Sequence, residues 1–271
     1  AYMGYYVKVE KGVNIYIEDI NPSADKTILF IHGWPANHQM FEYQFNQLPA
    51  LGYRCIGLDL RGFGKSSNPW ESYSYNRMAD DIRVIIDTLQ LENITLLGHS
   101  MGGAVAIRYM SRYKGHQVDK LALAGAAAPM FTMQPDFPYG TPITVVNELI
   151  SDTYNDRPKM VQDFGNLFYH RHLSESFQHW FQNLCLTASG HATAQCLETL
   201  RDEDLRSDLT RIHTPTLILH GKWDLICPYE LGELMYVQIQ NSMLVPFEYS
   251  GHGLFYEEKE KFNEELARFI G

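Results

Sequence analysis

TLLGHSMGGAVA, residues 95–106, is the stretch of sequence that decides the fold. An apolar run ends in a Gly-x-Ser-x-Gly pattern, and small residues with helical spacing follow at once. This order predicts a strand, a tight turn and a helix, with Ser100 at the turn. Gly98 and Gly102 leave room for the turn and for close packing of helix on strand. The pentapeptide alone is a weak signal, and its context makes Ser100 a candidate nucleophile.

Strand and helix patterns alternate on both sides of this stretch. Strands are predicted at 27–31, which is a continuous apolar run, and at 53–58, 94–98, 118–123, 215–220 and 242–247. Helices are predicted between and after them at 38–50, 76–90, 101–113, 228–239 and 255–270, and an antiparallel hairpin opens the chain at 4–20. Such alternation implies an α/β fold with a doubly wound, mostly parallel, eight-stranded sheet.

The alternation stops between residues 129 and 196. This segment has no apolar strand run and is rich in aromatic residues, methionine, histidine and proline. Short helices fit its pattern at 143–152, 158–168 and 174–187. We therefore predict a helical cap at 129–196, inserted into an α/β core made of residues 1–128 and 197–271.

Composition and charge narrow the classes of partner. The 271 residues are 45% hydrophobic and 20% charged, with a formal net charge of -10 and no cluster of lysine and arginine. Nucleic acid and anionic membranes are therefore poor partners, and a small neutral or apolar substrate is favoured. No apolar run reaches the roughly 18 residues of a membrane helix, and the start lacks the pattern of a signal peptide.

The four cysteines are scattered, without the paired spacing of a metal site. We expect reduced, structural thiols in a cytoplasmic protein, with a Cys185–Cys196 disulfide as the open alternative. No metal and no cofactor are expected.

A serine nucleophile needs an adjacent base. Four histidines follow predicted strand ends: His32, His99, His220 and His252. His252 lies in the glycine-flanked loop YSGHG, which gives the ring freedom to reach over the sheet edge, so it is the candidate base. His99 precedes Ser100 and is expected to point the opposite way. His220 ends a buried strand and is expected to be a hydrogen-bonded core residue.

The base in turn needs an orienting carboxylate. Asp224 follows the penultimate strand and lies between Ser100 and His252 in the chain, which is the order that this fold requires. The competing position, after the strand at 118–123, is empty because residues 124–135 contain no acid. The alternative for Asp224 is a solvated turn residue beside Cys227-Pro228.

The negative oxygen of an acyl-transfer transition state needs two oriented N–H donors. One is the backbone N–H of Met101, directly after the nucleophile. The other is the backbone N–H of Trp34, since Pro35 has none. His32-Gly33 is expected to shape this loop.

Two further groups of residues look functional. The segment from Asp59 to Ser66 places charges at a glycine-rich strand end, and we interpret it as structural, held by an ion pair. Candidate lining of a substrate pocket is Met130, Phe131, Ile226 and Leu254. The cap aromatics and methionines also fit the alternative of being the core of the cap itself.

These residues together resemble the α/β-hydrolase fold superfamily, over nearly the whole chain. Within it, the chain is similar to bacterial aryl esterases and cofactor-free haloperoxidases (perhydrolases). The resemblance rests on residues 32–35 (HGWP), 59–66, 98–103, 128–138 and 215–221. It implies hydrolysis of small carboxylic esters through an acyl-enzyme, with water or hydrogen peroxide as the acyl acceptor.

The chain matches that group at one further position and departs from it at others. In that group a proline after the oxyanion-loop tryptophan is associated with perhydrolysis, and Pro35 stands there. His99, however, replaces a frequent phenylalanine, and Lys222-Trp223 replaces small or acidic residues before Asp224. Two alternative functions stay open: a lactonase or γ-lactamase on the same triad, and a non-enzymatic ligand receptor on a hydrolase fold. Assembly as a homo-oligomer also stays open.

Overall fold

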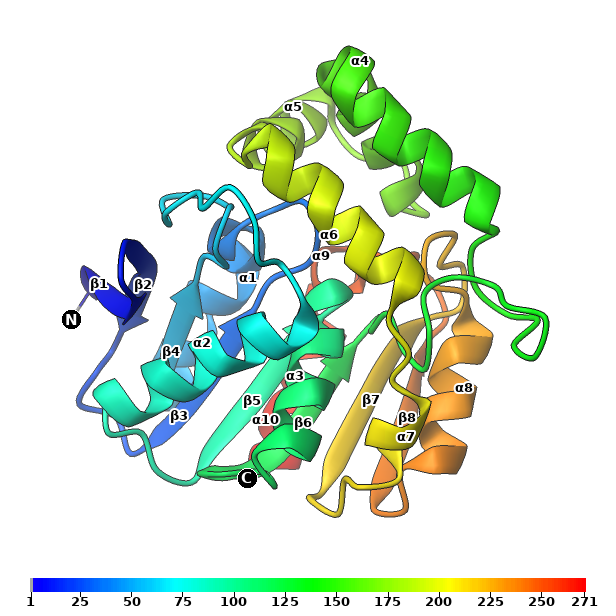
Figure 1. The fold of residues 1–271 in the computed structure, drawn as a ribbon. Helices are drawn as coiled ribbons and strands as arrows, with labels where there is room; N and C mark the ends of the chain where they lie inside the picture. Colours follow the sequence, from blue (N-terminus) through cyan, green and yellow to red (C-terminus); the bar gives the residue numbers. More distant parts are fainter. Residues whose placement is uncertain (1) are drawn as a thin grey trace.

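An eight-stranded sheet forms the centre of the computed structural model, which describes residues 2–271 (Figure 1). The strand order is β1-β2-β4-β3-β5-β6-β7-β8. The strands are β1 Tyr2–Glu10, β2 Val13–Ile20, β3 Lys26–Ile31, β4 Tyr53–Leu58, β5 Ile94–His99, β6 Val118–Ala124, β7 Thr216–Gly221 and β8 Ser242–Phe247. The β1–β2 hairpin joins β4 antiparallel, and β4-β3-β5-β6-β7-β8 are parallel. The predicted doubly wound, mostly parallel sheet is confirmed.

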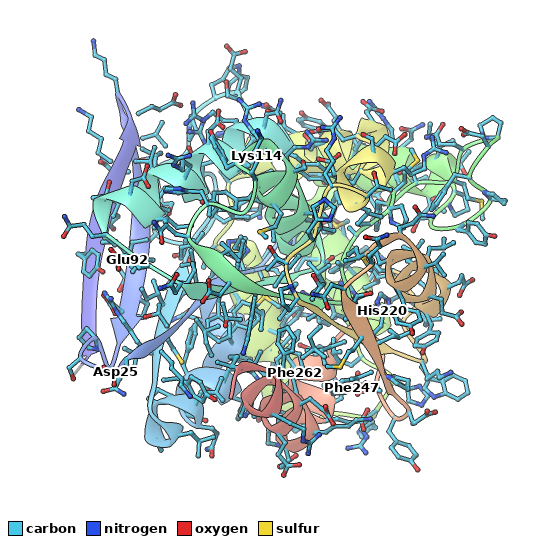
Figure 2. All side chains as sticks on the ribbon, turned by 90° about the horizontal axis from the view of Figure 1, so that it is seen from below. Asp25, Glu92, Lys114, His220, Phe247 and Phe262 are labelled. Atoms are coloured by element: carbon cyan, nitrogen blue, oxygen red, sulfur yellow. The ribbon has the colours of Figure 1, made fainter. Side chains whose placement is uncertain are left out.

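Helices cover both faces of the sheet, which buries its central strands completely (Figures 1 and 2). One face carries α2 (Tyr75–Thr88) and α3 (Met101–Arg112), and the other carries α1 (Glu42–Phe45) and α10 (Lys259–Ile270). Phe262 of α10 packs on Phe247 at the end of β8, with ring centroids 6.1 Å apart (Figure 2). The remaining core helices are α7 (Arg206–Leu209), α8 (Tyr229–Gln238) and α9 (Leu254–Glu257).

Two predicted helices are broken in the structure. The segment 38–50 forms three short turns instead: η1 (His38–Phe41), α1 and η2 (Leu48–Leu51). Pro49 in η2 lacks the N–H that a continuous helix needs. The last helix is divided into α9 and α10 at Glu258, whose φ of -128° and ψ of 55° are not helical.

Three helices lie above the carboxyl ends of the strands (Figure 1). They are α4 (Ile143–Phe168), α5 (Glu175–Leu186) and α6 (Gly190–Asp202). α4 is kinked at Asp156, two residues before Pro158, as the two separate predicted helices suggest. The predicted cap boundary at 196 falls inside α6, which continues to Asp202, so the division of the chain into domains stays a prediction.

The turn between β5 and α3 forces an unusual backbone on Ser100. Its φ of 55° and ψ of -118° lie in a region that non-glycine residues rarely adopt. A Cβ on Gly98 would lie 2.3 Å from the carbonyl oxygen of Gly102, and one on Gly102 would lie 2.2 Å from that of Ile31. Both glycines are therefore required by backbone contacts, which holds Ser100 rigidly at the sheet edge.

We expect Gly102→Ala to lower the free energy of unfolding by about 3 kcal/mol, because the added methyl meets backbone that cannot move away. Gly165→Ala is the matched control, since a Cβ there meets nothing within 4 Å. That helical substitution should raise stability by up to about 1 kcal/mol. Urea unfolding of both variants measures the difference, and equal effects would contradict the packing argument.

The described residues also bear on two expectations about the whole chain. None of the helices in residues 2–271 is long and apolar enough to cross a membrane. Cys185 and Cys196 are buried free thiols, as are Cys55 and Cys227, so the alternative of a Cys185–Cys196 disulfide is not realised.

Candidate active site

The ends of three parallel strands bring the predicted triad residues to one place. Ser100 follows β5, Asp224 follows β7 and His252 follows β8. His252 Nδ1 lies 2.8 Å from Asp224 Oδ2, and both side chains are completely buried. The other carboxylate oxygen, Asp224 Oδ1, accepts hydrogen bonds from the backbone N–H groups of Ile226 (2.9 Å) and Cys227 (2.8 Å). Asp224 is therefore an oriented buried acid rather than a solvated turn residue.

The second ring nitrogen of His252 is left free. With Nδ1–H donated to Asp224, the neutral ring presents Nε2 as an acceptor. Within residues 2–271 this buried Nε2 has no hydrogen-bond partner. Ser100 Oγ contacts Cys227 Sγ at 4.0 Å, and no hydrogen bond joins it to His252. Such serine–histidine bonds are often long before substrate binds.

The backbone N–H groups of Met101 and Trp34 make no hydrogen bond to a backbone oxygen among residues 2–271. Met101 begins α3, so its N–H is one of the free donors of a helix start. Trp34 lies in the loop after β3, and Gly33 of that loop is so close that a Cβ on it would lie 3.1 Å from Ser100 Cβ. These are the two groups predicted to bind an oxyanion.

His32 fixes the shape of this loop, as expected. Its Nε2 accepts from the backbone N–H of Leu60 (2.9 Å), so Nδ1–H donates to the carbonyl oxygen of Gly33 (2.9 Å). Complete burial lowers the pKa of His32 to about 4, which keeps the ring neutral.

His99 corrects the sequence-based expectation. Its place before Ser100 predicts a ring that points the opposite way, yet the ring lies 4.5 Å from that of His252, centroid to centroid. Its Nε2–H donates to the backbone oxygen of His252 (2.9 Å). Burial, with His252 nearby, lowers the pKa of His99 well below its ordinary value. The loop of His252 crosses the sheet edge on the side to which His99 points, and no local pattern reveals such a crossing.

Two other groups have the structural roles expected of them. His220 Nε2 donates to the backbone oxygen of Cys227 (2.7 Å) and lies 3.6 Å from Asp224 Oδ2. Arg61 is buried and pairs with Asp81 and Glu10. Asp59 accepts from both Nδ1 (2.7 Å) and the backbone N–H (2.8 Å) of His38. Although burial raises the pKa of Asp59, these bonds hold it below its ordinary value.

Because three histidines are buried, we expect the free energy of unfolding to fall in acid. Burial lowers the pKa of His32, His99 and His220, so the unfolded chain binds protons near pH 6.5 that the folded chain does not. The free energy of unfolding should therefore fall as the pH drops from 6.5 toward about 4, by up to about 1.4 kcal/mol per pH unit for each ring.

Urea unfolding between pH 7.5 and 5 measures this slope. His220→Asn should reduce this slope by the contribution of one ring, which is up to about 1.4 kcal/mol per pH unit. A wild-type stability that does not change over this range would contradict the prediction.

A small hollow lies between α4 and the loops after β6 and β7. It measures about 140 Å³, and its lining includes the predicted residues Phe131 and Ile226. Phe164 of the same lining packs edge-on against Trp34, with centroids 4.9 Å apart, which joins the hollow to the oxyanion loop. Met130 and Leu254 are buried but do not line it. The volume is near the roughly 150 Å³ of a cavity that binds benzene.

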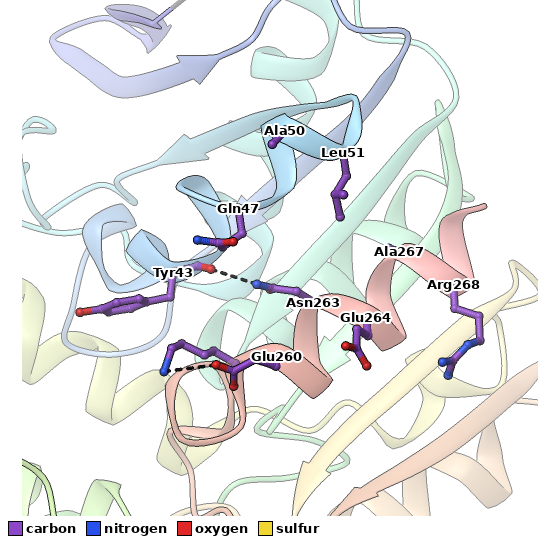
Figure 3. A pocket seen from close by; sticks show the side chains of 10 residues that line it. Tyr43, Gln47, Ala50, Leu51, Glu260, Asn263, Glu264, Ala267 and Arg268 are labelled. Atoms are coloured by element: carbon purple, nitrogen blue, oxygen red, sulfur yellow. Dashed lines mark hydrogen bonds and ion pairs between the residues drawn. The ribbon is translucent and has the colours of Figure 1, made fainter.

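A larger hollow of about 590 Å³ lies elsewhere, between the segment 43–51 and α10 (Figure 3). Its lining includes the polar residues Gln47, Glu260, Glu264 and Arg268 (Figure 3). None of the predicted site residues lines it. We therefore place the candidate active site at Ser100, beneath the cap.

Known proteins resemble this chain over nearly its whole length. A family model described as the alpha/beta hydrolase fold matches residues 26–259. The AB hydrolase superfamily protein YisY of Bacillus subtilis is 51% identical, over 98% of this chain and 99% of its own. An esterase from Exiguobacterium antarcticum is 48% identical, with a TM-score of 0.96 and 99% of both chains covered. A bromoperoxidase from Bacillus anthracis is 34% identical, with a TM-score of 0.95 and the same coverage.

Proposed function

The chain belongs to the alpha/beta hydrolase fold family, and from this premise we propose that it is a serine esterase that cleaves small carboxylic esters through an acyl-enzyme. The expected resemblance to esterases and haloperoxidases is confirmed by the solved structures named esterase and bromoperoxidase. The observation that carries the proposal is the buried Asp224–His252 pair beside a serine at positive φ.

Ser100 is the nucleophile in the proposed mechanism. Its Oγ attacks the ester carbonyl while His252 Nε2 takes the hydroxyl proton, which gives a tetrahedral oxyanion. The N–H groups of Met101 and Trp34 stabilise that oxyanion, and Asp224 stabilises the imidazolium. His252 then protonates the leaving alcohol. His252 then takes a proton from water as the water attacks the acyl-enzyme. The bond to Ser100 Oγ breaks, His252 returns the proton to Oγ, and the carboxylic acid is released.

Small esters fit the proposed site better than long ones. The hollow of about 140 Å³, whose lining residue Phe164 packs against Trp34, has room for a phenyl group or a short acyl chain. Most of its lining is apolar, and the net charge of -10 disfavours anionic substrates. A cytoplasmic location and action on a small neutral ester are part of this proposal.

Hydrogen peroxide in place of water is the second candidate for the acyl acceptor. Attack of peroxide on the acyl-enzyme would release a peracid by the same steps. It is favoured by Pro35 next to Trp34 and by the likeness to a bromoperoxidase.

One panel of substrates tests the function. With p-nitrophenyl esters of graded acyl length, turnover should fall as the acyl chain becomes longer. The rates with acetate plus hydrogen peroxide and with a lactone should then be compared with the ester rates. Absence of turnover of every ester in the panel would contradict the proposal, and turnover of the lactone alone would favour a lactonase. A ligand that raises thermal stability without being converted would then favour a receptor.

A further inference from the structure

Glu257 is a buried carboxylate that the proposed mechanism does not use. It ends α9, five residues after His252, and is 5% exposed. Its Oε1 accepts from the backbone N–H of Gly251 (2.9 Å). Its Oε2 accepts from the backbone N–H groups of His170 (2.9 Å) and Arg171 (2.6 Å). One side chain thus joins the loop of the candidate base to the segment between α4 and α5.

The partners of Glu257 are unusual for a buried charge. Such a group is costly to bury unless it is fully hydrogen-bonded, and it is commonly paired with a cation. Here its three bonds come from the main chain, and the Arg171 guanidinium instead donates to the backbone oxygen of Glu257 (3.0 Å). The carboxylate therefore fixes two pieces of backbone relative to each other.

Further contacts join the same two segments. The backbone N–H of Gly253 donates to the carbonyl oxygen of Phe168 (3.0 Å), the last residue of α4. The Phe168 ring packs edge-on against His252, with centroids 4.8 Å apart. A Cβ on Gly253 would lie 2.1 Å from the Tyr169 ring. The residues at the end of α4 therefore pack against Gly251 and Gly253, which flank His252 in the chain.

We propose that Glu257 is a positioning residue that latches the cap segment 168–171 onto the loop 251–253, so that His252 is aligned with Ser100 when the cap is seated. This inference rests on the proposed function of His252 as the base. Small displacements of a catalytic group, of about 1 Å, can lower a rate 100-fold.

Glu257→Gln tests the latch without changing the size of the side chain. An amide has one acceptor oxygen, so its NH2 group must face a donor, either Gly251 or the His170–Arg171 pair. One side of the latch must open. Asp208→Asn is the matched control, because Asp208 in α7 is equally buried (5%), bonds to Arg108 and Ser111, and lies outside the site.

We expect Glu257→Gln to lower kcat per titrated Ser100 by about 10- to 100-fold, with KM changed less than about threefold and faster hydrogen exchange at Gly251, His170 and Arg171. Asp208→Asn should lose thermal stability but keep kcat. A Glu257→Gln enzyme with wild-type kcat and pH profile would overturn the proposal.

Two further measurements keep the latch separate from foldability and from the proposed function. If Glu257→Gln does not fold, Glu257→Asp keeps the charge but shortens the reach, and unchanged kcat in it would also overturn the latch. If the wild-type enzyme cleaves no ester, the proposed function fails. The rate at which a fluorophosphonate labels Ser100, together with the exchange data, then still decides the role of Glu257.

Discussion

Ser100→Ala is expected to lower kcat for a short-chain aryl ester by about 10⁵-fold, while substrate binding is retained. The substitution removes one oxygen atom from a residue whose backbone is held by the contacts of Gly98 and Gly102. The oxyanion donors and the Asp224–His252 pair remain in place. The loss therefore reports the nucleophile and not the fold, and steady-state kinetics with a thermal unfolding curve measure both.

Cys227 supplies the control for this prediction. Its thiol is the other nucleophilic atom near Ser100 Oγ, 4.0 Å away. Burial raises the pKa of Cys227 well above its ordinary value, so it is an inert thiol at neutral pH. A fluorophosphonate should label the Ser100 peptide in wild-type and Cys227→Ala enzyme and nothing in Ser100→Ala. Labelling or turnover that survives in Ser100→Ala would refute the assignment.

The central strands of the sheet could be predicted from the sequence because they are buried on both faces. Such strands are short and rich in apolar residues. All six segments predicted from 27–31 to 242–247 are strands in the structure, although the edge strand β8 is only partly buried. The candidate triad followed from the same pattern, since parallel strands end at one edge of the sheet and only polar residues just past those ends come together.

What could not be predicted depends on contacts between distant segments. His99 lies against His252 because a loop 153 residues away folds over it. Glu257 sits in an ordinary helical pattern and becomes notable only when the segment after α4 lies on it. Phe131 and Ile226 line the small hollow whereas Met130 and Leu254 do not, because side-chain direction in irregular loops has no period to read.

Asp224→Asn is expected to lower kcat by about 10⁴-fold with little change in stability, because the structure allows the amide only one orientation. Asp224 Oδ1 accepts from the N–H groups of Ile226 and Cys227, so the amide oxygen must take that place. The NH2 group then faces His252 Nδ1, which must become the acceptor. The ring proton moves to Nε2, and the base can no longer accept a proton from Ser100.

Asp59→Asn makes the same chemical change at the other buried carboxylate that pairs with a histidine at a strand end. Asp59 bonds to His38 Nδ1 (2.7 Å) much as Asp224 bonds to His252 Nδ1 (2.8 Å). If proximity of a histidine and a carboxylate were enough for catalysis, the two variants would lose activity alike. We expect Asp59→Asn to keep kcat within about tenfold and to lose thermal stability instead, because removing one partner of a buried pair costs folding free energy. A larger loss of kcat in folded Asp59→Asn than in Asp224→Asn would contradict the assignment of Asp224 as the acid that orients the base.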